Sequence, residues 1–355
     1  MAGRRRTRST QNPAQLAGHV VDHGAVRAPA PHGHDPRPIA ITLGDACGIG
    51  PEIVLAACAD PSLAMPLRVV GDAALLAREA ARLSLPVPTL VDSVVALPTD
   101  LPVGRVDARA GDAAWRCIVH AANLALRGEV RAIVTAPIAK EAMHAAGHRF
   151  PGHTELLAEL AGSVEVRMML ANPELRTVLV SIHLSLREAL DRITYDNVLQ
   201  TIVITHTALE RAGIDRPRIA VAGVNPHAGE AGMFGHEEIE VIAPAIVAAR
   251  ARNIDASGPF APDTVFMRAR GLQAFDVVVA MYHDQGLIPV KYLGIDDGVN
   301  VTLGLPFVRT SPDHGTAFDI AGRLGPDGRG LASARSLVAA IRQADALSAA
   351  GRLDS

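Results

Sequence analysis

The sequence predicts an α/β fold with a largely parallel sheet, and two observations support this prediction. Short apolar runs of strand length alternate along the chain with longer segments of helical spacing. The chain is also 49% hydrophobic but only 3% aromatic, so its core must consist mainly of Ala, Val, Leu and Ile. Such a core suits helices that pack on β-branched strands. The length of 355 residues allows two domains of ordinary size.

The expected elements follow from the position of each apolar run. Residues 177–182 are apolar throughout, which favours a central strand. The expected strands are residues 39–43, 67–70, 131–135, 167–170, 177–182, 218–222, 277–281 and 299–303. One expected helix begins at Gly50, next to Pro51, and the others span residues 73–83, 112–126, 196–212, 236–252 and 333–350.

Composition and charge make several classes of protein improbable. A net charge of -3 gives no sign of a nucleic-acid or membrane partner, and no apolar run reaches the length of a membrane span. The three cysteines have no metal-type spacing and fit a reducing, cytoplasmic compartment. Residues 1–37 carry an arginine cluster without an apolar core after it, so we expect a disordered extension rather than a signal peptide.

Three histidines, His183, His227 and His283, each stand where an apolar run ends. Ligands bind at strand ends in α/β folds, and histidine is the commonest metal ligand. Three imidazoles suffice for a catalytic metal that keeps an open position. Asp263 and Asp284 are carboxylates that could approach it, and a mixed set of this kind suits Zn, Co, Mn or Mg. The alternative is that each histidine only caps its own loop.

Four further segments carry polar or glycine-rich patterns. The loop from Gly44 and Asp45 to Glu52 opens a helix and could present free N–H groups to an anion. In the segment Pro-Gly-His153-Thr154-Glu, Thr154 could cap the following helix and leave His153 free for a ligand. The remaining candidates are Lys291, Asn300 and Arg309, which could form an anion pocket, and the small-residue segment with His314, Gly315 and Asp319.

Together these segments resemble the 4-hydroxythreonine-4-phosphate dehydrogenase family of pyridoxal phosphate biosynthesis. The resemblance is carried by Pro-Gly-His-Thr-Glu, Asn-Pro-His-Ala-Gly-Glu, Met-Tyr-His-Asp-Gln-Gly, the long run around Asn300 and Arg309, and Asp-His-Gly-Thr-Ala, and it extends from about Pro38 to the C-terminus. It implies a homodimer of two-domain α/β/α subunits with the active site in the cleft between the domains. It also implies oxidation of a small phosphorylated hydroxy acid by NAD or NADP, followed by decarboxylation.

The resemblance assigns roles to individual residues. His183, His227 and His283 match the ligands of one divalent metal (Zn, Co, Mg or Mn), with the residue matching His283 supplied by the partner subunit. His153, Thr154, Lys291, Asn300 and Arg309 match substrate contacts. The general base stays open among Asp263, Asp284 and a water on the metal.

The loops at the two ends of the chain also resemble those of the isocitrate and isopropylmalate dehydrogenases. This second likeness implies that Gly44, Asp45, His314, Gly315 and Asp319 contact the cofactor. It further implies a terminal domain (residues 38–137 plus 305–355) around a middle domain (residues 138–304) that carries the metal, the substrate and the dimer interface. The chain departs from the family pattern at Ala46-Cys47, where proline and alanine are usual, and we expect a less rigid loop.

Three alternatives remain at this level. A sister group with nearly the same motifs oxidises D-threonate or D-erythronate 4-phosphate, and a third relative acts on a dihydrodiol dicarboxylate but lacks the His-Thr pair. A zinc hydrolase could also use three histidines, but it would not need Lys291, Asn300 and Arg309. A binding protein without activity would have no use for the histidine trio.

Overall fold

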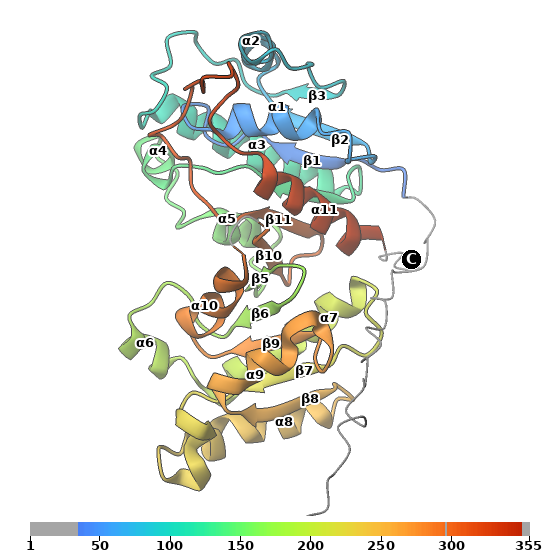
Figure 1. Cartoon of the computed structure of the whole chain (residues 1–355), viewed down its shortest axis with the longest axis vertical. Helices are drawn as coiled ribbons and strands as arrows, with labels where there is room; N and C mark the ends of the chain where they lie inside the picture. Colours follow the sequence, from blue (N-terminus) through green and yellow to red (C-terminus); the bar gives the residue numbers. More distant parts are fainter. Residues whose placement is uncertain (1–34, 295–296, 350–355) are drawn as a thin grey trace, which may run out of the picture. The chain divides into compact units, whose positions relative to one another are not determined.

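A computed structural model describes residues 35–294 and 297–349, so most of the predicted extension at residues 1–37 lies outside the described residues. The described chain forms an eleven-stranded sheet in the order β3-β2-β1-β4-β11-β10-β5-β6-β9-β7-β8 (Figure 1). The strands are β1 (Ile39–Thr42), β2 (Leu67–Gly71), β3 (Val91–Ser93), β4 (Ala132–Thr135), β5 (Arg167–Ala171), β6 (Arg176–Leu179), β7 (Ile219–Ala222), β8 (Ala256–Phe260), β9 (Val277–Ala280), β10 (Val299–Leu303) and β11 (Val308–Pro312).

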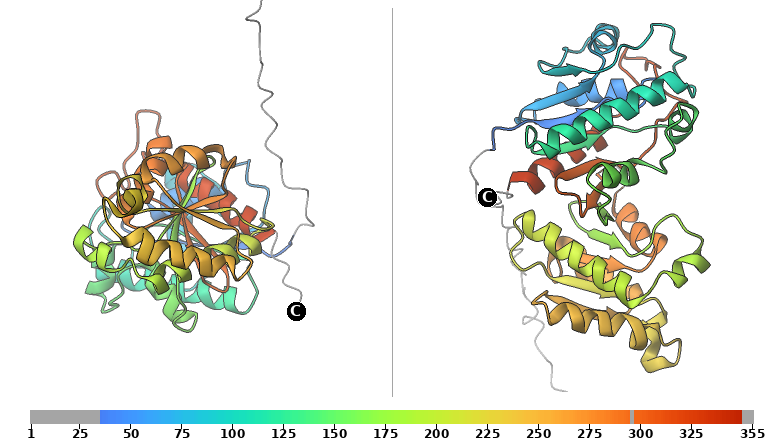
Figure 2. Two further views of the ribbon diagram at one scale, coloured as in Figure 1. Left: turned by 90° about the horizontal axis from the view of Figure 1, so that it is seen from below. Right: turned by 180° about the vertical axis from the view of Figure 1, so that it is seen from behind.

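The prediction of a largely parallel α/β sheet is confirmed. Antiparallel pairing occurs only in the middle of the described sheet, where β10 pairs with β11 and β5, and β5 pairs with β6. All other pairs are parallel. The strand predicted to be central, β6, lies between β5 and β9. The strands fan out when the sheet is seen end-on, as the twist of strands requires (Figure 2).

Helices cover both faces of this sheet. Side chains of α1, α2, α7, α8 and α11 belong to the largest hydrophobic cluster on one face, whereas α3, α5, α9 and α10 pack against the other face. The α-helices are α1 (Gly50–Cys58), α2 (Ala73–Leu83), α3 (Ala108–Leu126), α4 (Lys140–Ala145), α5 (His153–Leu160), α6 (Leu186–Asp191), α7 (Tyr195–Arg211), α8 (Ala243–Arg250), α9 (Pro262–Ala269), α10 (His283–Leu293) and α11 (Arg335–Ala349). No helix of the described residues is long and apolar enough to cross a membrane.

Two stretches differ from the prediction for identifiable reasons. Helix α10 was missed because Gly286 and Pro289 read as helix breakers. A Cβ at position 286 would lie 2.5 Å from Cδ2 of Leu179, so glycine is what lets α10 pack closely on β6. The helix predicted for residues 236–252 is present, but its first part is a π-helical turn, η2 (Glu238–Ile242), which leads directly into α8, where Pro244 cannot donate a backbone hydrogen bond.

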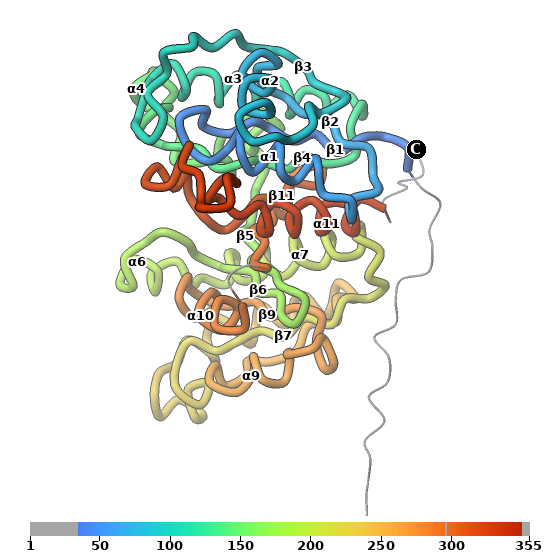
Figure 3. The backbone as a smooth tube through the Cα atoms, turned by 45° about the horizontal axis from the view of Figure 1, so that its top comes forward, coloured from blue at the N-terminus to red at the C-terminus, as the bar shows by residue number. Residues whose placement is uncertain are grey.

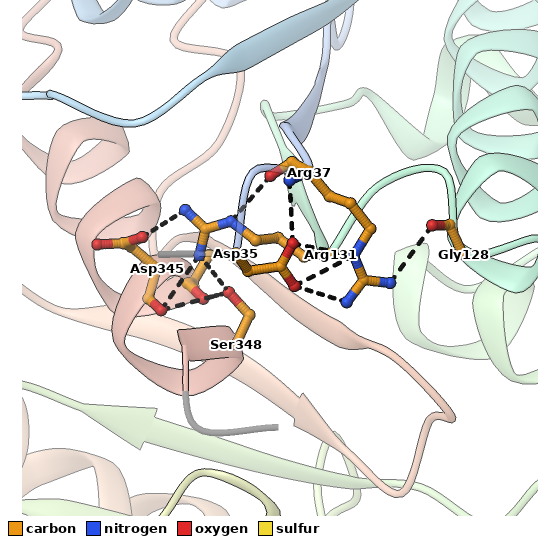
Figure 4. A network of polar contacts seen from close by, with 7 residues as sticks. Asp35, Arg37, Gly128, Arg131, Asp345 and Ser348 are labelled. Carbon is orange, nitrogen blue, oxygen red and sulfur yellow. Dashed lines mark hydrogen bonds and ion pairs between the residues drawn. The ribbon is translucent and has the colours of Figure 1, made fainter. Parts of the chain in front are cut away.

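A buried arginine ties the two ends of the described chain together. The Arg131 guanidinium donates to the backbone oxygen of Arg37 at 3.0 Å and to Oγ of Ser348 at 2.7 Å, and it pairs with Asp345 (Figure 4). The same helix, α11, packs beside β11, β4 and β1, although these strands are far apart in sequence (Figure 3). The division into domains 38–137 plus 305–355 and 138–304 stays a prediction, since one sheet runs through both parts.

Candidate functional site

The three histidines follow three neighbouring parallel strands. Strands β6, β9 and β7 pair in parallel, and His183, His283 and His227 come after them in that order across the sheet. Their side chains thus start from the same edge of the sheet. His183 and His227 have left-handed backbone, with φ of 50° and 53°. His283 does not enter a loop as the pattern suggested; it is the first residue of α10.

Side-chain hydrogen bonds cross-link these strand ends. The Ser181 hydroxyl donates to the backbone oxygen of Met281 at 3.0 Å, which joins the ends of β6 and β9. The Gln285 amide donates to the backbone oxygen of Gly223 at 2.8 Å and accepts from the backbone N–H of Met281 at 2.7 Å. That single side chain therefore joins β9 to β7. The backbone that presents all three histidines is held as one unit.

His183 and His283 lie beside each other, with ring centroids 5.7 Å apart. They line a cavity of about 230 Å³ together with Ser181, Leu186 and Asp284, among others. Nδ1 of His283 is 2.7 Å from Oδ1 of Asp284, a contact that favours an orienting role for this carboxylate. Burial, with the positive charge of Lys140 and neighbouring His283, lowers the pKa of His183 and so favours its neutral form.

His227 opens a left-handed turn of five residues. The φ angles from His227 to Ala231 are 53°, 53°, 80°, 43° and 55°, and only Gly229 among them is glycine. Left-handed backbone costs about 1 kcal/mol or more for each residue with a Cβ, and it normally occurs at single positions. A run of this kind persists only where its surroundings hold it. The sequence pattern Asn-Pro-His-Ala-Gly-Glu gave no sign of it.

The described part of one chain does not complete a metal site. Among residues 35–294 and 297–349, no group of three or more His, Cys, Asp or Glu side chains is close enough together to hold a metal ion. Asp263, in the first turn of α9, is exposed.

A buried cation lies on the sheet face that α3 and α5 cover. Arg309 on β11 is 2% exposed and donates to the hydroxyls of Thr302, at 3.0 Å, and Thr135, at 2.6 Å. Its Nε has no partner, and no carboxylate of the described residues forms an ion pair with it. Burial lowers the pKa of Arg309 to about 10, so it stays charged at neutral pH. The charge of Glu155 raises the pKa and so opposes part of this effect, but Glu155 forms no ion pair with Arg309, and a buried charge without a paired counter-ion is costly unless a ligand supplies one.

His153 adjoins this cation at the start of α5. Burial, with the charges of Arg309 and Lys140, holds the pKa of His153 well below its usual range, and its Nε2 is buried without a partner. The suggestion that Thr154 caps α5 is wrong. The helix begins at His153 with Gly152 as its cap residue, so Thr154 is the second helical residue.

Lys140 is a site residue that motif reading missed. Its charge lowers the pKa of both His153 and His183, so it lies near the buried cation and near the strand-end histidines. It is the first residue of α4, shortly after the end of β4. The available signal was the position of Lys140 after a predicted strand, in a segment without a glycine-rich or histidine motif.

Asn300 and Lys291 lie in different surroundings. Asn300 on β10 is two residues from Thr302, and therefore on the same face of the sheet, and its Oδ1 is buried without a partner. Lys291 on α10 forms an ion pair with Asp313, with Nζ 2.8 Å from Oδ2. A substrate anion at Lys291 would share this lysine with Asp313.

The glycine-rich loop and the segment after β11 come together. The backbone N–H of Ile49 donates to the oxygen of Thr316 at 3.0 Å, and a Cβ at Gly48 would lie 2.8 Å from that oxygen. His314, Gly315 and Asp319 in this segment are exposed. Cys47 is fully buried, and burial raises the pKa of its thiol to about 12, so the thiol belongs to the core and not to a binding surface.

Asp45 in this loop is expected to make stability depend on pH. It is 1% exposed, and burial raises the pKa of its carboxyl to about 6. The folded protein holds this proton more tightly than the unfolded chain, so stability falls as the pH rises from about 4 through 6. Asp45→Asn removes this loss. The difference in unfolding free energy between Asp45→Asn and the unmodified protein should shift in favour of the variant by about 2 kcal/mol between pH 4.5 and pH 7.5, as measured by urea titration.

The matched control is Asp60→Asn. Hydrogen bonds from Ser62 lower the pKa of Asp60, which is the opposite direction, so this variant should gain nothing as the pH rises. An advantage of Asp45→Asn that is equal at both pH values would contradict the raised pKa.

Comparisons with known proteins agree with one another. A family model described as pyridoxal phosphate biosynthetic protein PdxA matches residues 62–344. The chain is 52% identical over 331 residues to a 4-hydroxythreonine-4-phosphate dehydrogenase of Beijerinckia indica, covering 88% of this chain and 95% of that one. It is 50% identical over 304 residues to a D-threonate 4-phosphate dehydrogenase of Salmonella typhimurium, covering 80% and 93%.

A solved structure supports the same relationship. The crystal structure of 4-hydroxythreonine-4-phosphate dehydrogenase from Klebsiella pneumoniae superposes with a TM-score of 0.81 at 45% identity, over 89% of this chain and 99% of that chain. Both the sequence match and the fold therefore extend over most of the chain, and the chain belongs to the PdxA family of dehydrogenases.

Proposed function

We propose that this protein oxidises the secondary alcohol of 4-phosphooxy-L-threonine to a 3-oxo acid, which loses carbon dioxide to give 3-amino-2-oxopropyl phosphate. A nicotinamide cofactor, NAD or NADP, accepts the hydride. The observation that carries this proposal is the buried, unpaired Arg309 beside neutral His153. Lys140 lies near both, as its effect on the pKa of His153 indicates, and cationic and hydrogen-bonding groups gathered in this way suit the anionic groups of a phosphorylated hydroxy acid.

The residues at the strand ends fit a divalent metal. Metal ligation requires neutral imidazole, which burial favours at His183, and Asp284 can hold the His283 ring from its Nδ1 side. We assign His183 and His227 of one subunit and His283 of the partner as its ligands in a homodimer. When bound, a Zn, Co, Mg or Mn ion supplies Lewis acidity that lowers the pKa of the substrate alcohol.

The protein's own residues bind and orient the reactants. The substrate's phosphate and carboxylate are held by Arg309, His153, Thr154, Asn300 and Lys291. The nicotinamide cofactor is held where the loops from the two ends of the chain meet. The residues assigned to it there are Gly44, Asp45, His314, Gly315 and Asp319. Asp263 and Asp284 are the candidates for removing the alcohol proton. A small metabolite substrate and a soluble cofactor suit the cytoplasm, which we propose as the location.

A second function is favoured by the similarity to D-threonate 4-phosphate dehydrogenase, which is close to that of the first relative. The test is a substrate panel with the purified, metal-loaded protein, followed by NADH or NADPH formation. Turnover of 4-phosphooxy-L-threonine but not of D-threonate or D-erythronate 4-phosphate supports the first proposal. The reverse result assigns the second function, and no turnover with any of them contradicts both.

A further inference from the structure

The left-handed turn that carries His227 is organised around one buried carboxylate. Glu238, the first residue of η2, is 2% exposed. Its Oε1 accepts from the backbone N–H groups of Val224, at 2.7 Å, and Asn225, at 2.8 Å. Its Oε2 accepts from the Asn225 side-chain amide at 2.9 Å. The carboxylate has no ion pair with any described cation, so these loop contacts are its partners.

The backbone on both sides of His227 is shaped to admit this carboxylate. A Cβ at Gly223, before the turn, would lie 2.8 Å from Oε1 of Glu238, and one at Gly229, within the turn, would lie 2.8 Å from Oε2. Glycine at these two places is what lets the main chain approach so closely. Gly229 also has a φ of 80°, in the middle of the left-handed run. The main chain before His227 and the main chain after it therefore both pack directly against the Glu238 carboxylate.

We propose that Glu238 is a positioning residue that holds the His227 imidazole ready to bind the metal. This inference rests on the proposed function, because it takes His227 as a metal ligand. A run of left-handed residues would relax toward ordinary backbone if nothing held it. Glu238 fixes the two residues that precede Pro226 and His227, and so fixes where the turn begins. Groups behind a metal ligand typically change metal affinity when they are removed.

The test is Glu238→Gln in the full-length protein, with Co²⁺ as the probe. Glutamine keeps one oxygen for the two backbone N–H groups, but its NH₂ faces the Asn225 amide, and two donors then oppose each other. We expect Co²⁺ affinity, measured by titration calorimetry, to fall about 10- to 100-fold and the visible spectrum of the bound ion to change. The KM for the nicotinamide nucleotide should stay the same.

Two further variants sharpen this test. Glu240→Gln changes an exposed glutamate of the same π-helical turn and should bind Co²⁺ as the unmodified protein does. The Asn225 amide donates to Oε2 of Glu237, at 2.6 Å, as well as to Oε2 of Glu238, so the compensating variant combines Glu237→Gln and Glu238→Gln with Asn225→Asp and restores a donor facing an acceptor at both contacts. It should therefore recover most of the lost affinity, which a loss of stability alone would not predict.

Three results decide between the possibilities. Unchanged Co²⁺ affinity and spectrum in Glu238→Gln, with only a lower urea midpoint, would overturn the inference and leave Glu238 a structural role. If that variant does not fold, Asn225→Ala removes the amide contacts to Glu237 and to Oε2 of Glu238 but keeps both backbone contacts of Glu238. A loss of about fivefold in affinity then supports the inference, while no loss overturns it. Tight Co²⁺ binding by His227→Ala would instead refute the metal assignment of the proposed function.

Discussion

Replacing His227 by alanine is expected to lower kcat/KM about a thousandfold, equivalent to roughly 4 kcal/mol of lost transition-state stabilisation. With His227 gone, the strand-end site loses one of its two ligands from that subunit. The two remaining imidazoles, those of His183 and the partner's His283, bind a divalent ion too weakly to retain it at micromolar concentration. The measurements are steady-state kinetics on the preferred substrate and metal content of the dialysed protein.

His236→Ala is the matched control, because His236 is an exposed histidine nine residues further along the same loop region. It should keep both activity and bound metal. Full turnover by His227→Ala in metal-free buffer would contradict the metal assignment. Loss of activity in both variants would point instead to a general disturbance of the loop.

A mixing experiment tests whether the site is shared between subunits. His227→Ala and His283→Ala are both expected to be inactive as homodimers. If His283 serves the partner's site, a mixed dimer has one intact site, and random re-association should restore about a quarter of the original activity. If all three ligands came from one chain, no mixture of the two variants would recover activity. That result would remove the shared site while leaving the substrate assignment untouched.

The sequence predicted those parts of the fold that depend on local pattern. Apolar runs located β1, β4 and β9 within a residue or two, because buried parallel strands are apolar on both faces, whereas β6 ends three residues before its predicted end. Helix α10 was missed because Gly286 and Pro289 oppose helix locally, and only the close packing of Gly286 on Leu179 explains the glycine. Tertiary contacts of this kind are absent from a one-dimensional pattern.

The same division applies to the candidate site. Motifs named the three histidines, His153 and Arg309, since they stand in distinctive surroundings. They did not reveal Lys140 or Glu238, which act through neighbours that only the folded chain brings close. Glu238 lies 11 residues after His227 in a segment that reads as an ordinary amphipathic helix, and its role becomes visible through its bonds to Val224 and Asn225.

Arg309 supports the second large prediction, because it differs from the other buried arginines. Arg131 pairs with Asp345, and Arg167 pairs with Glu165, so each has a carboxylate partner. Arg309 is more deeply buried than either, yet its hydrogen-bond partners in the described chain are two threonine hydroxyls, and Glu155 acts on it only by its nearby charge, without an ion pair. The fall of its pKa from 12.5 to about 10 corresponds to about 3 kcal/mol of unfavourable free energy for keeping the charge buried.

We expect Arg309→Met to raise the KM for the phosphorylated substrate about 100- to 1000-fold, because two charge-assisted hydrogen bonds to the anion are lost. Arg309→Lys keeps the charge but lacks the planar guanidinium that can donate two parallel hydrogen bonds, so it should raise the KM about tenfold or more. Because methionine removes an uncompensated buried charge, the urea midpoint of Arg309→Met should stay equal or rise. Kinetics and urea unfolding of the same preparations measure both effects.

Arg131→Met is the control with the opposite signature. Removing this arginine leaves Asp345 without its partner and breaks the contact with Ser348, so stability should fall while the KM stays the same. The contrast separates a charge kept for the fold from a charge kept for a ligand. If Arg309→Met instead lost stability by several kcal/mol and bound substrate normally, Arg309 would belong with Arg131 as a structural residue. The phosphate would then have to be held elsewhere, with Lys140 and Lys291 as the remaining cations to test.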